Sequence, residues 1–228
     1  MEEYTTSALN NLSSYIEQTY LKPDFTDQTL YSLIEQAQQY SFKGICVPPF
    51  WVKKARRELG SKTIELVTVV GFPLGYHRTE TKLEETRLAL IDGATEIDLV
   101  VNMSAFKAGM NWPKIEIAKV ADLVHQAGGL LKVIIETAYL SDEEIKLLCR
   151  LCADAGSDFV KTSTGFAPQG AKAEHIRLMR ASLPESVGIK ASGGIKNYHE
   201  ALKMIEAGAD RIGTSSGPDI ITDMARHA

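Results

Sequence analysis

The stretch DAGSDFVKT, residues 154–162, decides the fold because its pattern occurs four times in the chain. The other copies are DGATEIDLV (92–100), QAGGLLKVII (126–135) and EAGADRIGT (206–214). In each copy an amphipathic segment ends near a glycine, which suits the left-handed residue that commonly closes a helix. A short apolar run follows, as is typical of a buried strand in a parallel sheet. The pattern therefore predicts the helix-to-strand junctions of repeated βα units.

Outward from these junctions, the same reading gives eight candidate strands with helical segments between them. A doubly wound sheet would need a glycine-rich nucleotide turn after the first strand, and SYIEQTYLKPD (14–24) has no glycine. We therefore predict an α/β fold: a single (β/α)₈ TIM barrel over residues 1–228, with an N-terminal helical extension. The candidate strands lie near 14–19, 43–48, 64–71, 95–101, 130–136, 158–162, 187–191 and 210–214.

Composition and charge exclude several classes of function. The 228 residues carry a net charge of -4 and no basic stripe, which argues against binding to nucleic acid. No apolar run approaches the roughly 18 residues of a membrane helix, and the polar start of the chain is unlike a secretory signal. Three cysteines, an odd count, favour a reducing cytoplasm. We expect a cytoplasmic protein without a membrane or nucleic-acid partner, and a homodimer stays open.

Charged side chains fall at inward positions of several predicted strands. In EIDLV (96–100), Ile97 and Leu99 should face the helices, so the residues between them point into the barrel. Barrel active sites form at the C-terminal ends of the strands. We therefore expect Asp98, Lys161 and Lys190 to converge there. The same alternation gives these inward charged residues: Glu96, Asp98, Lys132, Glu136, Lys161 and Lys190.

Two inward lysines on neighbouring strands predict Schiff-base chemistry. A lysine nucleophile must be neutral, and a second cation in a low dielectric favours loss of its proton. Lys161 would then attack a carbonyl, while Lys190 stays charged beside Asp98 and relays protons. The competing interpretation is a buried network of lysines and carboxylates that only orders the core of the barrel.

Small residues after the last three strands predict a phosphate site. The segments are STG (163–165), SGG (192–194) and GTSSG (213–217). Loops after strands seven and eight of a barrel often bind phosphate through backbone N–H groups. A phosphorylated small-molecule substrate is therefore expected.

No metal site or cofactor is predicted. Cys149 and Cys152 form a C-x-x-C, but they share one helix face with Ile145 and Leu148, so we interpret them as core residues. No second Cys/His pair has ligand spacing. Ser141 and Glu144 form a capping box that starts this helix.

The motifs taken together resemble the deoxyribose-phosphate aldolases, a family of class I aldolases of deoxyribose breakdown. The resemblance covers nearly the whole chain. Its carriers are TVVGFPLG (68–75), TEIDLVVN (95–102), KVIIET (132–137), DFVKTSTGF (158–166), KASGGIK (190–196) and RIGTSSG (211–217).

The resemblance implies a lyase that reversibly cleaves 2-deoxy-D-ribose 5-phosphate into D-glyceraldehyde 3-phosphate and acetaldehyde. It implies that Lys161 forms the imine, that Lys190 tunes it and that Asp98 joins in proton transfer. The expected substrate and phosphate contacts are Glu17, Thr164, Gly165, Gly193, Gly194, Ser215 and Ser216.

The chain departs from the family pattern at three places. Glu17-Gln18 stands where members often have Asp-His, and Phe166 stands where some have lysine. The chain also lacks the C-terminal tyrosine of some members, since its last tyrosine is Tyr198. Two alternatives stay open: another Schiff-base sugar-phosphate aldolase or transaldolase, and a weakly active sugar-phosphate-binding barrel.

Overall fold

The computed structural model describes residues 12–227, in which eight parallel strands close into a barrel in the order β1 to β8. All eight predicted strands are present, so the TIM-barrel prediction is confirmed. Their bounds are Ile16–Thr19 (β1), Gly44–Val47 (β2), Glu65–Val70 (β3), Glu96–Val100 (β4), Leu130–Ile134 (β5), Phe159–Lys161 (β6), Gly188–Ser192 (β7) and Arg211–Thr214 (β8).

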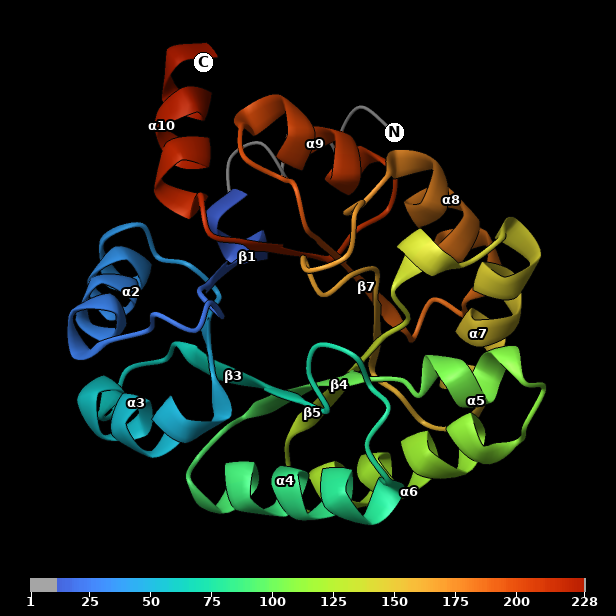
Figure 1. The fold of residues 1–228 in the computed structure, drawn as a ribbon. Coiled ribbons are helices and arrows are strands. Elements are labelled where there is room, and N and C mark those ends of the chain that lie inside the picture. The colour runs from blue at the N-terminus through green and yellow to red at the C-terminus, as the bar shows by residue number, and fades with distance from the viewer. Residues whose placement is uncertain (1–11, 228) are drawn as a thin grey trace.

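Helices surround the barrel as an outer ring (Figure 1). The α-helices are Asp27–Gln39 (α2), Val52–Leu59 (α3), Thr79–Ile91 (α4), Met103–Lys107 (α5), Trp112–Gln126 (α6), Asp142–Asp154 (α7), Ala173–Ser182 (α8), Tyr198–Glu206 (α9) and Gly217–His227 (α10). Short 3₁₀ helices span Leu12–Tyr15 (η1), Pro49–Trp51 (η2) and Thr137–Tyr139 (η3). The predicted N-terminal helical extension falls mostly on residues 1–11, which lie outside the described part of the chain.

The signals that predicted the junctions act as expected. A glycine follows each of α4, α6, α7 and α9, and its φ lies in a positive region that residues with a Cβ rarely adopt. The φ values are 101° at Gly93, 73° at Gly128, 87° at Gly156 and 109° at Gly208. The predicted capping box at the start of α7 is also present, because the Ser141 side chain accepts from the Glu144 N–H and the Glu144 side chain accepts from the Ser141 N–H.

Apolar residues form two separate layers. The outward residues of the strands, such as Ile97, Leu99 and Ile189, pack with the helices in one large core. Cys46, Val67 and Val69 form a small cluster of their own inside the barrel. Hydrophobic packing therefore fixes which residues of each strand turn outward, and the charged residues between them are left facing the interior. Within residues 12–227, no helix is long and apolar enough to cross a membrane.

Candidate active site

Asp98 lies at the centre of the charges inside the barrel. Its Oδ2 accepts hydrogen bonds from Lys161 Nζ and Lys190 Nζ, each at 2.7 Å. The two lysines are direct partners on β6 and β7, so their side chains leave the sheet side by side. Asp98 and Lys190 are fully buried, and Lys161 is 3% exposed. The structure therefore brings together the three residues that the sequence predicted to converge.

Lys132, on β5, completes the contacts of Asp98 from the other side. Its Nζ lies 3.2 Å from Asp98 Oδ1 and also donates to Glu96 Oε2. The sequence placed Lys132 inside the barrel but gave it no role. Its position leaves Asp98 Oδ2 to the other two lysines. Lys132 therefore orients the carboxylate and contributes positive charge beneath the site.

Glu17 on β1 reaches past β8 to Lys190 on β7, whose Nζ donates to Glu17 Oε2. The other Glu17 oxygen lies 3.5 Å from Lys132 Nζ and 3.7 Å from Arg211 Nε. Gly213 makes room for this arrangement, because a Cβ there would lie 3.0 Å from Lys190 Cε. Lys190 is thus held between two carboxylates, Glu17 and Asp98.

These contacts decide the charge states of the interior. Burial opposes the charge of Lys190, but the carboxylates of Asp98 and Glu17 outweigh burial and raise the pKa of Lys190. Burial alone would also raise the pKa of Asp98, yet Lys132, Lys161 and Lys190 hold that pKa well below its ordinary value. Asp98 therefore stays a carboxylate and Lys190 stays an ammonium, as the predicted division of roles requires.

A cavity of about 180 Å³ opens at the C-terminal ends of β1, β6, β7 and β8. Of the interior lysines 132, 161 and 190, the one that lines this cavity is Lys161. Five of the seven predicted substrate contacts also line it: Thr164, Gly165, Gly193, Gly194 and Ser215. A small molecule in the cavity would therefore meet one buried amine and a rim of small residues.

Three of the residues predicted to contact the substrate form hydrogen bonds or ion pairs within the protein. Glu17 does not line the cavity; it is fully buried in its ion pair with Lys190. Ser216 is also outside the lining, and its N–H donates to Thr214 Oγ1 at 3.0 Å. Thr164 lines the cavity, but Glu136 Oε2 accepts from both its N–H and its hydroxyl. Direct substrate contacts by Glu17 and Ser216, and an anion contact by the Thr164 N–H, are therefore not supported by this geometry.

Two lysines in the cavity wall were missed by the sequence prediction. Lys22 follows β1, and Lys196 follows the Gly193-Gly194 pair after β7. Both lie in loops, where side-chain direction has no periodic pattern. Lys196 ends the KASGGIK motif, and its place in that motif was the one sequence signal that could have indicated a role in the site. The two cations lie in the same wall as the predicted phosphate loops.

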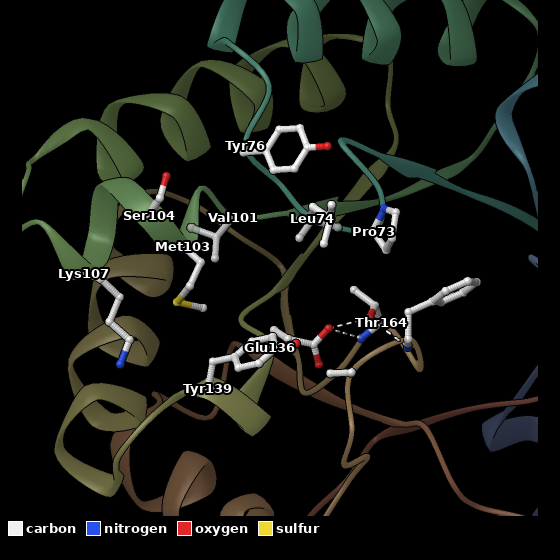
Figure 2. Close-up of a pocket in the computed structure, with 13 residues that line it drawn as sticks. Pro73, Leu74, Tyr76, Val101, Met103, Ser104, Lys107, Glu136, Tyr139 and Thr164 are labelled. Atoms are coloured by element: carbon white, nitrogen blue, oxygen red, sulfur yellow. Dashed lines mark hydrogen bonds between the residues drawn. The ribbon is translucent and has the colours of Figure 1, made fainter.

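A second cavity of about 360 Å³ lies beside the first, between the loops that follow β3 to β6. Its walls are mostly apolar, with Leu74, Tyr76 and Met103 among them (Figure 2). Thr164 and Phe166 line both cavities. Phe166 packs edge-on against Phe72, with ring centroids 5.2 Å apart. The residue that stands in place of a lysine thus forms part of an apolar partition between the two cavities.

Comparisons with known proteins identify the family of this chain. A sequence profile of the DeoC/LacD family aldolases matches residues 14–222. The chain belongs to this family. It is 47% identical over 215 residues to a deoxyribose-phosphate aldolase of Brevibacillus brevis, an alignment covering 93% of this chain and 96% of that protein. A deoxyribose-phosphate aldolase of Thermococcus gammatolerans is 47% identical over 221 residues, covering 96% and 98% of the two chains.

Solved structures of aldolases have the same fold. The aldolase QR15 superimposes with a TM-score of 0.89 at 39% identity, covering 95% of this chain and 97% of its own. The deoxyribose phosphate aldolase of Aeropyrum pernix, described as a unique tetramer, gives a TM-score of 0.90 at 32% identity, covering 97% and 94%. The family and its barrel are therefore shown by sequence and by structure.

Proposed function

We propose that this protein is a deoxyribose-phosphate aldolase, a lyase that reversibly cleaves 2-deoxy-D-ribose 5-phosphate into D-glyceraldehyde 3-phosphate and acetaldehyde. The observation that carries the proposal is that Lys161 alone of the interior lysines 132, 161 and 190 lines the cavity, while Lys190 and Asp98 lie buried behind it. The names of the relatives at 44–47% identity favour this reaction over the two alternatives.

Cleavage begins with Lys161 as a free amine. Its Nζ attacks C1 of the open-chain sugar to give a carbinolamine, which loses water to form a protonated imine. The imine draws the electrons of the C2–C3 bond as the C3 hydroxyl loses its proton, so the bond breaks and D-glyceraldehyde 3-phosphate leaves. The remaining enamine takes up a proton at C2, and water then releases acetaldehyde and regenerates the amine.

The buried charges support the proton transfers of this reaction. Lys190 and Lys161 share the same Asp98 oxygen, each at 2.7 Å, so a proton has a short path between them. The Lys190 ammonium also lies beside the nitrogen that becomes the imine, because both lysines donate to the same Asp98 oxygen. Asp98 then balances the positive charge of the imine.

The phosphate group is assigned to the rim formed by Gly165, Gly193, Gly194 and Ser215. Small residues there allow the backbone to approach an anion closely. Lys22 and Lys196 supply positive charge in the same wall. These two lysines supply the positive charge that a lysine at position 166 would supply, where this chain has Phe166.

A direct assay tests the proposal. The protein is incubated with 2-deoxy-D-ribose 5-phosphate, and acetaldehyde and D-glyceraldehyde 3-phosphate are measured separately. Equal amounts of both are expected from the wild type and none from Lys161→Met. Binding of the sugar phosphate without cleavage would favour the weakly active binding barrel instead.

Two further expectations accompany the function. We place the enzyme in the cytoplasm, in keeping with three free, buried cysteines in the described residues. A homodimer stays a prediction.

A further inference from the structure

Gln18, near the end of β1, forms hydrogen bonds with both ends of the turn that follows β8. Its Nε2 donates to the Ser215 carbonyl at 3.1 Å, and its Oε1 accepts from the Gly217 N–H at 3.0 Å. Gln18 as a whole residue is 3% exposed. Contact is close enough that a Cβ on Gly217 would lie 2.6 Å from Gln18 Oε1. One buried amide thus fixes the path of residues 215–217.

A second glutamine fixes the orientation of that amide. Gln18 Nε2 also donates to Gln36 Oε1 at 2.8 Å, and Gln36 Nε2 donates to Ser32 Oγ at 3.1 Å, both on α2. The two protons and the oxygen of Gln18 are therefore all used. A carboxylate at position 18 could accept from Gly217 but could donate to neither carbonyl oxygen. The network requires a group that both donates and accepts.

The turn held by Gln18 forms part of the wall where the phosphate is assigned. Ser215 lines the cavity together with Gly194 and Lys196. From the other side, Thr214 Oγ1 donates to the Ile195 carbonyl at 2.6 Å, which ties the same turn to the loop after β7. Gln18 and Thr214 thus hold the turn from opposite sides, toward β1 and toward β7. Displacing it would move the anion-binding rim but not Lys161 or Asp98.

We propose that Gln18 is a positioning residue that sets the affinity for the phosphoryl group without taking part in the carbon–carbon chemistry. The inference deepens the proposed function and rests on it for the identity of the substrate. It assigns a role to a position where the chain departs from its family pattern, and it makes Gln18–Gln36 a determinant of preference for phosphorylated over unphosphorylated sugars.

The test compares wild type, Gln18→Leu and Gln18→Glu on two substrates, 2-deoxyribose 5-phosphate and unphosphorylated 2-deoxyribose. Each Gln18 variant should raise KM for the phosphorylated substrate about tenfold, as expected when a buried hydrogen-bonded group is lost. Its kcat should stay within about twofold, as should kcat/KM for 2-deoxyribose. Gln39→Glu, the same change at an exposed position of α2, is the matched control and should behave as wild type.

Inorganic phosphate as a competitive inhibitor separates this inference from the proposed function. Its inhibition or binding constant should rise in parallel with KM in the Gln18 variants. If the wild type shows no cleavage, the proposed function fails, and phosphate binding measured by calorimetry still tests the role of Gln18. Equal losses on both substrates, or unchanged phosphate affinity, would overturn the inference. Should Gln18→Leu not fold, Gln36→Met removes the orienting acceptor and should give a smaller effect of the same kind.

Discussion

At the scale of single residues, the chemistry depends on how charge is shared around Asp98. Three lysines surround the Asp98 carboxylate. Two of these lysines also pair with a second carboxylate, Lys190 with Glu17 and Lys132 with Glu96. Breaking a buried pair of this kind leaves an unpaired charge and typically costs about 3–5 kcal/mol. Each member of the cluster therefore depends on the others, and single substitutions should affect both stability and activity.

Lys190→Leu is the substitution that tests the division of roles between the two lysines. Without the Lys190 ammonium, Asp98 Oδ2 loses one of its two lysine partners, and the short proton path from Lys161 is broken. We expect kcat to fall roughly 100-fold or more. Lys190→Arg keeps a cation beside Asp98 and should lose less activity than Lys190→Leu. A kcat of Lys190→Leu within about tenfold of the wild-type value would refute the role of Lys190 in proton transfer.

At the scale of secondary-structure elements, the sequence predicted the strand residues of the site and five residues of the rim, but missed the two lysines in the loops. Period-two alternation predicted that Asp98, Lys161 and Lys190 point inward, because apolar residues beside them must pack against helices. The pairing of Glu17 with Lys190 was not predictable, since it forms only when β1 and β8 close the barrel. Lys22 and Lys196 lie in loops, where no period fixes side-chain direction. The small residues of the rim were therefore predictable from the segments after strands six, seven and eight, whereas its two charged loop residues were not.

The two cysteines of α7, a helix outside the active site, allow a prediction about thiol reactivity. Cys149 and Cys152 are fully buried on the face of α7 that packs into the core, and burial raises the pKa of Cys149 to about 12. Neither thiol should react with iodoacetamide at pH 8 in the native protein, and both should react after unfolding. Replacing both by alanine should lower the free energy of unfolding by about 1–3 kcal/mol without changing kcat. Rapid alkylation of the native protein at these cysteines would contradict their assignment as core residues.

At the scale of the whole molecule, closure of the barrel forms both the buried charge cluster and the cavity beside it. Its closure brings Glu17 of β1, Asp98 of β4 and Lys190 of β7 into one buried cluster. The same closure places the loops after β1, β6, β7 and β8 around one cavity at the C-terminal ends of the strands. The fold class was fully predictable from the repeated junction. The ion-pair partners inside the barrel depend on the register and closure of the sheet, so they required the structure.

This buried cluster predicts how the stability of the molecule depends on pH. The positive charges of the lysines keep the pKa values of Asp98 and Glu17 below their ordinary values, despite the opposing effect of burial. Carboxylates whose pKa falls on folding contribute stability above their unfolded pKa of about 4, and this stability is lost as the pH falls through the folded pKa. The urea midpoint should therefore drop steeply below about pH 4.

Glu17→Gln should make that drop shallower, because one of the two carboxylates no longer titrates. Glu35→Gln, at an exposed position of α2, is the matched control and should keep the wild-type dependence. An identical pH dependence in wild type and Glu17→Gln would argue against a stabilising contribution from this carboxylate.

The most direct test of the central claim is to trap the imine on Lys161. The protein is incubated with acetaldehyde and borohydride, and the modified lysine is located by peptide mass spectrometry. We expect one ethyl group on Lys161, and no adduct in Lys161→Arg. No adduct in the wild type, or an adduct on Lys190 or a surface lysine with Lys161 unmodified, would contradict the account.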